Sequence, residues 1–269
     1  MLIHNTLILG SLTVMFAAII QSLTGFGFGV VAVPFLLFIF PSQQAVLLSM
    51  ILSLCSLCLH FIPSRRTADW HTVWYLIAVG LPGLILGVIF GGKINPVYLK
   101  GIIGITLVAY VANQWLQTER ENLKIKDPES LEKIDIPQNF ASNRKSYGLT
   151  TAGFFSGLLT GVVGLPGPPV VAVLIRSLPK DKFQATVVSY FVIEYSLAIT
   201  SYLIFRNSSS FETLITTILI LILPTVAGFL ISRPIRRLIV ESNFKRLVFL
   251  LLLIVGFTSI GDFVRNLCH

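Results

Sequence analysis

The sequence predicts an all-α polytopic membrane protein, and both composition and segment length lead to that class. Of 269 residues, 54% are hydrophobic and only 12% are charged, and the mean hydropathy is +0.84. A soluble domain usually carries about 25% charged residues, because its surface faces water. Apolar runs such as residues 214–231 and 247–260 approach the ~20 residues that a helix needs to cross a bilayer. Because these runs are continuous rather than alternating, helices are expected rather than a closed barrel.

Gly, Pro and charged residues divide the chain into about ten apolar segments. In the first half, residues 1–116, the segments are expected at 4–22, 25–40, 43–62, 72–91 and 97–116. In the second half, residues 147–269, they are expected at 147–163, 166–178, 183–205, 211–231 and 244–262. Residues 117–146 hold six basic and six acidic residues, which predicts a solvated cytoplasmic linker. The second segment of each half is short and broken by Gly and Pro.

The two halves resemble each other at four landmarks that occur in the same order. Thr24-Gly25 corresponds to Thr160-Gly161, and each pair is followed by a Gly-rich turn. The other pairs are Ala45–Ser49 with Ala185–Ser189, Leu81-Pro82 with Leu223-Pro224, and Leu99-Lys100 with Phe244-Lys245. This pattern indicates an internal duplication of the kind found in transporters built from repeats.

The distribution of basic residues favours an inverted duplication. If all ten segments cross with the N-terminus outside, sixteen of the twenty Lys and Arg residues face the cytoplasm. If the two short segments turn back instead, the twenty Lys and Arg residues are at best divided evenly between the two sides of the membrane. The positive-inside rule therefore favours ten crossings. Five crossings per half is an odd number, and the second copy is then inverted relative to the first. Both termini of this multi-pass protein of the cell membrane are expected to be extracytoplasmic.

Each half contains one point where Gly and Pro interrupt the apolar pattern. The interruptions are residues 21–29, with the sequence QSLTGFGFG, and residues 160–169, with the sequence TGVVGLPGPP. A helix that begins at such a break presents free N–H groups and a positive dipole end, which together bind anions. Alternatively the glycines only let helices pack closely, as Gly25 and Gly29 would in a G-x-x-x-G contact. The occurrence of breaks at matching positions of both halves favours the binding site.

Glu194 lies deep inside an apolar segment. Because a charged carboxylate in hydrocarbon costs several kcal/mol, the side chain is expected to be neutral, or to face a polar cavity or partner. It is a candidate proton-coupling residue. A structural carboxylic acid that is hydrogen-bonded by Tyr190, Tyr195 or the backbone is an equal alternative.

Several classes of protein are disfavoured by what the sequence contains. The net charge of +8 comes from basic residues grouped between apolar segments, which indicates topology rather than nucleic-acid binding. The chain has no P-loop, zinc-protease or nucleophile-elbow motif, so neither an enzyme nor a catalytic, metal or cofactor site is expected. Cys55 and Cys58 form a C-x-x-C inside an apolar helix, which is interpreted as two small packed residues. Residues 1–12 lack a basic n-region and a cleavage site, so the first segment is expected to be retained.

The two break sequences resemble the TauE/SafE family of membrane transporters, also called the sulfite exporter or TSUP family. The similarity rests on Gln21–Gly29 followed by Pro34, on Ser156–Pro169, and on Arg65–Trp70, and it spans nearly the whole chain apart from the linker. The resemblance implies secondary transport, with export as the first choice, of small sulfur-containing anions such as sulfite or sulfonates. Alternating access of the two halves around a midplane site is the expected mechanism.

Carried onto this chain, the resemblance places the substrate against the two breaks. The expected substrate-binding residues are Gln21, Thr24, Gly25, Phe26, Gly27, Phe28 and Gly29 in the first half, and Thr160, Gly161, Gly164, Leu165, Gly167 and Pro168 in the second. The expected partners are a small anion and the lipid bilayer, and assembly into a homo-oligomer stays open. Two alternatives are an anion channel, and a membrane subunit that delivers sulfur species to a partner, for which Cys55 and Cys58 would matter.

Overall fold

The structure of the chain is a computed structural model that describes residues 2–91, 138–205 and 211–238, with short pieces between 97 and 112 and between 257 and 265. Every regular element within these residues is an α-helix, so the predicted all-α class is confirmed. The elements are α1 (Leu2–Thr24), α2 (Phe28–Ile39), α3 (Ser42–Ser64), α4 (Trp70–Gly91), α6 (Gln138–Val163), α7 (Gly167–Ser177), α8 (Lys180–Phe205) and α9 (Phe211–Leu238).

Most helices lie close to the predicted segments. α6 differs, because it begins at Gln138, inside the stretch predicted as linker. The predicted segments 97–116 and 244–262 and the rest of the linker fall mostly outside the described residues, so the count of ten crossings stays a prediction.

Among the residues that the structure describes, five helices are long and apolar enough to cross a bilayer: the spans are Leu7–Thr24, Gln43–Ser64, Trp70–Gly91, Lys182–Phe205 and Leu214–Pro234. The outer surface agrees, because large apolar side chains are exposed on it. Trp74 is 59% exposed, Ile204 71% and Leu223 76%. Large apolar side chains exposed in this number are stable in lipid and unfavourable in water. The chain is therefore a multi-pass membrane protein.

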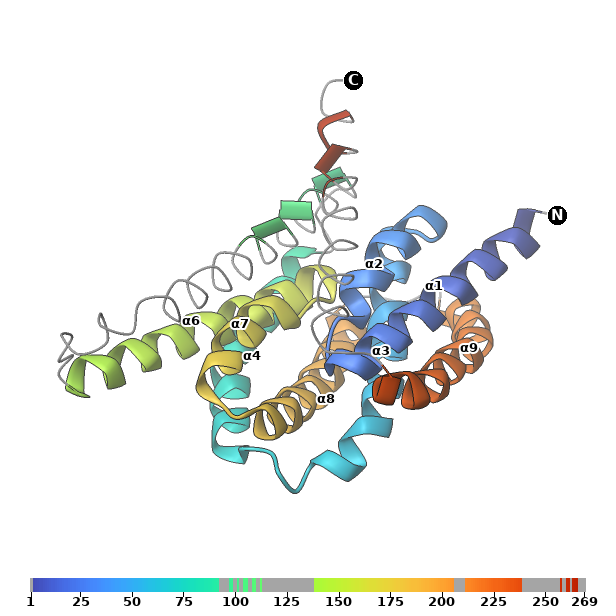
Figure 1. Ribbon diagram of the computed structural model, residues 1–269. Coiled ribbons are helices and arrows are strands. Elements are labelled where there is room, and N and C mark those ends of the chain that lie inside the picture. The colour runs from blue at the N-terminus through green and yellow to red at the C-terminus, as the bar shows by residue number, and fades with distance from the viewer. Residues whose placement is uncertain are drawn as a thin grey trace.

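The helix pairings repeat when the first four described helices are exchanged for the last four. α1 packs against α9, and its counterpart α6 packs against α4. α4 packs on α8 as α9 packs on α3, while α3 and α8 pack on each other. Figure 1 shows α4 and α6 side by side, and α1 beside α9. The first helix of each half therefore packs against the fourth helix of the other half.

Glycines allow the backbones of α4 and α6 to approach closely. A Cβ atom at Gly83 would collide with the carbonyl oxygen of Phe154, and one at Gly157 would collide with that of Gly80. At the matching crossing of α1 and α9, a Cβ atom at Gly228 would collide with the carbonyl oxygen of Met15. Small residues that bring helices into backbone contact are typical of membrane proteins.

The turn between α3 and α4 is fixed by its own polar groups. Asp69 caps α4, since its carboxylate accepts hydrogen bonds from the Thr72 N–H at 3.3 Å and the Thr72 hydroxyl at 2.9 Å. Its backbone N–H donates to the Thr186 hydroxyl of α8 at 3.0 Å. Partial burial acts to raise the pKa of Asp69, but the bonds from Thr72 outweigh it and hold this pKa below its ordinary value. The turn thus joins the first half to α8.

Candidate substrate site at the two helix breaks

The first break is a turn that glycines make possible. α1 ends at Thr24, and the φ angles are 83° at Gly25 and 99° at Gly27, where residues with a Cβ are disfavoured. The Gly25 N–H donates to the carbonyl of Gln21 at 2.7 Å and closes α1. The Thr24 hydroxyl accepts the Phe26 N–H at 3.3 Å. The chain can then start α2 in a new direction.

The N-terminus of α2 offers several backbone donors. The Val31 N–H is the first to reach an intrahelical carbonyl, that of Gly27, at 3.1 Å. The N–H groups of Phe28, Gly29 and Val30 precede it in the first turn, where an α-helix has no carbonyl of its own for them. Phe28 is fully buried and Val30 is 5% exposed, so these donors lie away from bulk solvent. The helix dipole adds a positive potential at the same point.

The second break has similar geometry but fewer donors. Gly164 has a φ of 73°, so this residue, not Gly161, occupies the position that Gly25 has in the first break. The Gly164 N–H donates to the Thr160 carbonyl at 2.9 Å, and the Leu165 N–H donates to the Leu159 carbonyl at 3.4 Å. Residues 166, 168 and 169 are prolines and have no N–H. Gly167 is therefore the only residue of the cap and first three positions of α7 that brings an N–H.

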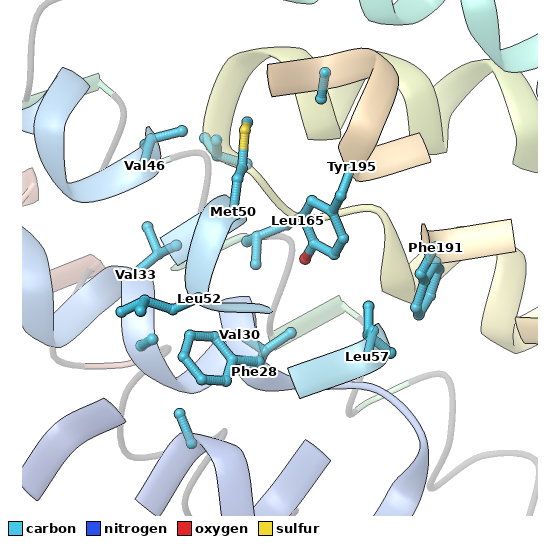
Figure 2. Packing of buried hydrophobic residues seen from close by; sticks show 14 of the residues in the cluster. Phe28, Val30, Val33, Val46, Met50, Leu52, Leu57, Leu165, Phe191 and Tyr195 are labelled. Carbon is cyan, nitrogen blue, oxygen red and sulfur yellow. The ribbon is translucent and has the colours of Figure 1, made fainter. Parts of the chain in front are cut away.

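The two breaks touch each other in the interior. The position of a Cβ atom at Gly29 would be 2.9 Å from the Gly164 carbonyl oxygen and 3.0 Å from Leu165 Cδ2. A Cβ atom at Gly167 would be 3.9 Å from the ring of Phe26. Figure 2 shows Leu165 and the ring of Tyr195 together near Met50. The two sequence breaks, which are far apart along the chain, therefore lie together in the structure.

α8 and α6 hold the carbonyl groups of the second break. The Tyr195 hydroxyl donates to the Gly164 carbonyl at 3.3 Å. The Ser156 hydroxyl donates to the Pro166 carbonyl and accepts from the Tyr190 hydroxyl at 3.0 Å. Because buried carbonyls are costly when unpaired, these bonds stabilise the unwound backbone.

Glu194 is buried between α8, α6 and α4, and it is 2% exposed. The Thr160 hydroxyl donates to Glu194 Oε1 at 3.1 Å, and Tyr190 also hydrogen-bonds the carboxyl group. On the α4 side, a Cβ atom at Gly80 would lie 3.6 Å from Glu194 Oε2. The Thr160 carbonyl accepts the Gly164 N–H, so Thr160 alone links the carboxyl group of Glu194 to the second break.

Gln21 connects the first break to α3. Its side-chain Nε2 donates to the Ser53 hydroxyl at 2.9 Å, and Ser53 also hydrogen-bonds Tyr195. Gln21 Oε1 is buried and has no hydrogen-bond partner. A buried unpaired amide oxygen of this kind is rare, and it leaves Gln21 able to accept one more hydrogen bond.

For Gly161 and Pro168, the described part of the structure shows no hydrogen-bond donor that belongs specifically to the candidate site. Gly161 lies in the last turn of α6, where a Cβ atom would collide with the Leu84 carbonyl oxygen of α4, so helix packing already accounts for it. Pro168 is at the second position of α7 and brings no donor. The other predicted residues lie at or next to the breaks, whereas Ser53, Ser156 and Tyr195 were not predicted as part of the site.

The described residues contain no group of three or more His, Cys, Asp or Glu that could hold a metal ion. Cys55 is half-buried and Cys58 is exposed on α3, and both are free thiols.

A comparison with known families decides the identity. The model of one family, described as Sulfite exporter TauE/SafE, matches residues 11–258. The chain belongs to the TauE/SafE family. The resemblance seen at Gln21–Gly29 and Ser156–Pro169 is thereby confirmed, and both breaks of this TauE/SafE protein lie inside the matched region. Among curated proteins and solved structures, no match was found.

Proposed function

We propose that this TauE/SafE protein is a secondary exporter of small sulfur-containing anions, such as sulfite or organic sulfonates. The single observation that carries the proposal is the buried N-terminus of α2, with the N–H groups of Phe28, Gly29 and Val30 in its first turn. A sulfite or sulfonate group has three acceptor oxygens, which suits a cluster of backbone donors at a positive dipole end. A site of this kind needs no basic side chain.

The anion is held mainly by the first half. α2 brings four N–H groups at its cap and first three positions, residues 27–30, whereas α7 brings only that of Gly167. The contact between Gly29 and Gly164 brings the start of α2 next to the second break, so an anion bound at α2 would also lie near the start of α7. Gln21, with its unpaired Oε1, supplies an acceptor that suits a protonated oxyanion such as bisulfite.

Alternating access is the transport mechanism that this arrangement supports. Both breaks are buried and in contact, which corresponds to a closed site. Opening requires the backbone of Gly29 to separate from that of Gly164, while the exchanged helix pairs give the halves two matched interfaces on which to rock. The ten-segment inverted repeat predicted from charge is the architecture in which that rocking exposes the site to either side.

Two driving forces are available. The membrane potential is worth about 2.3 kcal/mol per charge per 100 mV, and it favours exit of an anion from a negative interior. Glu194, which is linked to the second break through Thr160, is the candidate for proton coupling.

Flux into proteoliposomes tests the proposal. Purified protein is assayed with sulfite and with several organosulfonates, with and without a pH gradient, and counterflow is measured under the same conditions. Saturable flux of one sulfur oxyanion with counterflow supports a carrier. Flux that does not saturate and shows no counterflow would instead indicate a channel, and folded protein that carries none of these anions would overturn the substrate class.

A further inference from the structure

A second polar cluster lies where α1, α3 and α9 meet, with His60 partly buried in it, and the anion site does not use it. His60, in the penultimate turn of α3, approaches the Ser22 hydroxyl of α1 with its Nε2 at 3.1 Å. The Ser232 hydroxyl of α9 donates to the Ser22 hydroxyl. Ser22 is 4% exposed and Ser232 is fully buried. Three helices from both halves are therefore joined by one histidine and two hydroxyl groups.

The partners of His60 determine where its hydrogen atoms lie. Its Nδ1 is 3.2 Å from the carbonyl oxygen of Ser56, which can only accept, so Nδ1 carries a hydrogen. In neutral imidazole the other nitrogen, Nε2, must then accept a hydrogen bond, and Ser22 is the donor. The chain of donors runs from Ser232 through Ser22 to His60.

The same heavy atoms also accommodate a protonated His60. When Ser22 passes its proton to Nε2, it takes one from Ser232, which takes one from outside the cluster. The bond between Nε2 and Ser22 is then donated by the imidazolium, Ser22 donates to Ser232, and Ser232 donates to its alternative acceptor, the Phe229 carbonyl. One proton enters and one N–H forms, and Ser22 both donates and accepts a hydrogen bond in each state.

A polar stripe on α3 connects this cluster to the break. Ser49, Ser53, Ser56 and His60 are spaced by four, three and four residues, so they share one helix face. Ser53 binds Gln21, the neighbour of Ser22. The hydroxyls of Ser49 and Ser56 are buried without a hydrogen-bond partner, as is Gln21 Oε1. Unpaired buried polar atoms along one line are what a path for water or protons would leave.

The cluster also has a counterpart in the other half. The junction of α1, α3 and α9 corresponds to that of α6, α8 and α4 when the halves are exchanged, and the second junction holds Glu194. Each junction thus contains a titratable side chain that is hydrogen-bonded to the helix preceding a break.

The helices that pack against α3 differ in their ionisable groups. α1 between Leu7 and Thr24 and the whole of α2 contain none. α8 contributes Glu194, its tyrosines and, at its start, Lys180, Asp181 and Lys182, and the sequence of α9 contains Glu212, Arg233, Arg236 and Arg237. Arg233 of α9 lies over the ring of Phe229 at 5.0 Å, and His60 meets that ring edge-on at 4.6 Å. On α3 itself are Cys55, Cys58 and, after its end, the exposed Arg65 and Arg66.

We propose that His60 is a proton-exchanging residue, that Ser22 and Ser232 relay its proton, and that it couples protons to the first break as Glu194 does to the second. The coupling part rests on the proposed transport function. The protonation part stands without it.

Nuclear magnetic resonance tests the protonation part. In protein with His4, His71 and His269 changed to Asn, His60 is the sole histidine, and its ring nitrogens are followed by ¹⁵N shifts from pH 5 to 9, the range in which histidines usually titrate. The expected result is one titrating imidazole whose neutral form carries hydrogen on Nδ1. Ser22→Ala and Ser232→Ala should shift the Nε2 signal and the titration midpoint. Ser196→Ala is the control, since that exposed hydroxyl bonds only the Val192 carbonyl, and it should change neither.

Flux assays test the coupling part. His60→Gln keeps a hydrogen-bonding group toward Ser22, but its amide does not take up or release a proton. The variant should therefore retain counterflow and lose the part of the pH-gradient response of net flux that His60 provides. An imidazole that does not titrate, a neutral form with hydrogen on Nε2, or a Ser232→Ala protein with an unchanged titration would overturn the relay. An unchanged gradient response in His60→Gln would overturn the coupling. If wild-type protein carries no sulfur anion, the transport proposal fails while the titration still decides the relay.

Discussion

The carbonyl oxygen of Gly164 lies 2.9 Å from the place that a Cβ atom would occupy at Gly29. These residues come from the two halves of the chain, and their backbones approach because neither side presents a side chain. The contact brings the donor end of α2 to the unwound carbonyls before α7.

Gly29→Ala should weaken the closed form. The added methyl group meets backbone, which cannot rotate away, and overpacking of this kind costs about 1–3 kcal/mol. The measurement is thermal unfolding of purified protein together with flux. Gly148→Ala is the control, because nothing lies within 4 Å of its Cβ position. Equal stability of the two variants would show that the breaks do not pack as described.

Val30→Pro should lower the affinity for the anion. It removes one N–H from the first turn of α2, a position where proline is compatible with a helix and where α7 already has Pro169. A hydrogen bond to a charged group is worth about 1.5–3 kcal/mol, which corresponds to roughly a 10- to 150-fold loss in affinity.

The reciprocal change, Pro169→Val, adds an N–H to α7 and should leave affinity equal or higher. Competition by unlabelled anion in the counterflow assay measures both variants. Equal losses in the two would contradict the unequal roles of the helix ends.

Gly157→Ala and Gly228→Ala should both reduce the yield of folded protein. Each adds a methyl group where the backbone of the opposite helix is in contact, at the α4–α6 and α1–α9 crossings respectively. Gly10→Ala in α1 should be tolerated, because its Cβ position is 3.8 Å from the nearest side-chain atom. Size-exclusion chromatography in detergent, before and after mild heating, compares the three.

The Glu194→Gln protein should fold, and its net flux should lose the part of the pH dependence that Glu194 provides. The amide oxygen can still accept from Thr160, but the side chain no longer exchanges a proton. Glu194→Asp keeps a titratable group and should retain part of the response. The assay is net flux as a function of internal and external pH, and a response identical to wild type in Glu194→Gln would leave the carboxyl group a structural one.

Asp69 gives a pH dependence of stability outside the membrane spans. Its pKa is lower in the folded protein than the ordinary value of 3.8, so its contribution is complete above that pH and is lost as the pH falls through the folded value. Asp69→Ala should cost about 0.5–2 kcal/mol at neutral pH, since a helix cap is lost. Asp69→Asn retains a cap, and its stability relative to wild type should become more favourable below pH 3.8. Unfolding measured from pH 7 to pH 3 tests both variants.

Helix positions were largely readable from the sequence, because long apolar runs and Gly or Pro breaks act locally. The starts of α2 at Phe28 and α7 at Gly167 follow directly from the residues before them. The register of the duplication was harder to read. Thr24-Gly25 was paired with Thr160-Gly161, but the left-handed glycine of the second half is Gly164. Gly161 packs closely against the backbone of α4, and one chain alone does not separate a glycine that forms a turn from one that allows close helix packing.

The interior contacts of the site were beyond the sequence for a different reason. Glu194 could be recognised as a buried acid from its own neighbours, but its partner Thr160 lies 34 residues away. The bonds from Tyr195 to Gly164 and from Gln21 to Ser53 depend on which faces of distant helices meet. Periodicity does not specify those faces in helices that are apolar all round.

The exchange of first helices between the halves has a consequence for how such a chain could arise. A single half, folded alone, would leave α1 without α9 and α4 without α6, and would expose the glycine surfaces that fit only another backbone. Two copies of a half-length chain would cover both surfaces by pairing with each other. A half-length ancestor would therefore have been an obligate dimer. Fusion of two copies of its gene would have converted the contacts between two molecules into contacts within one chain.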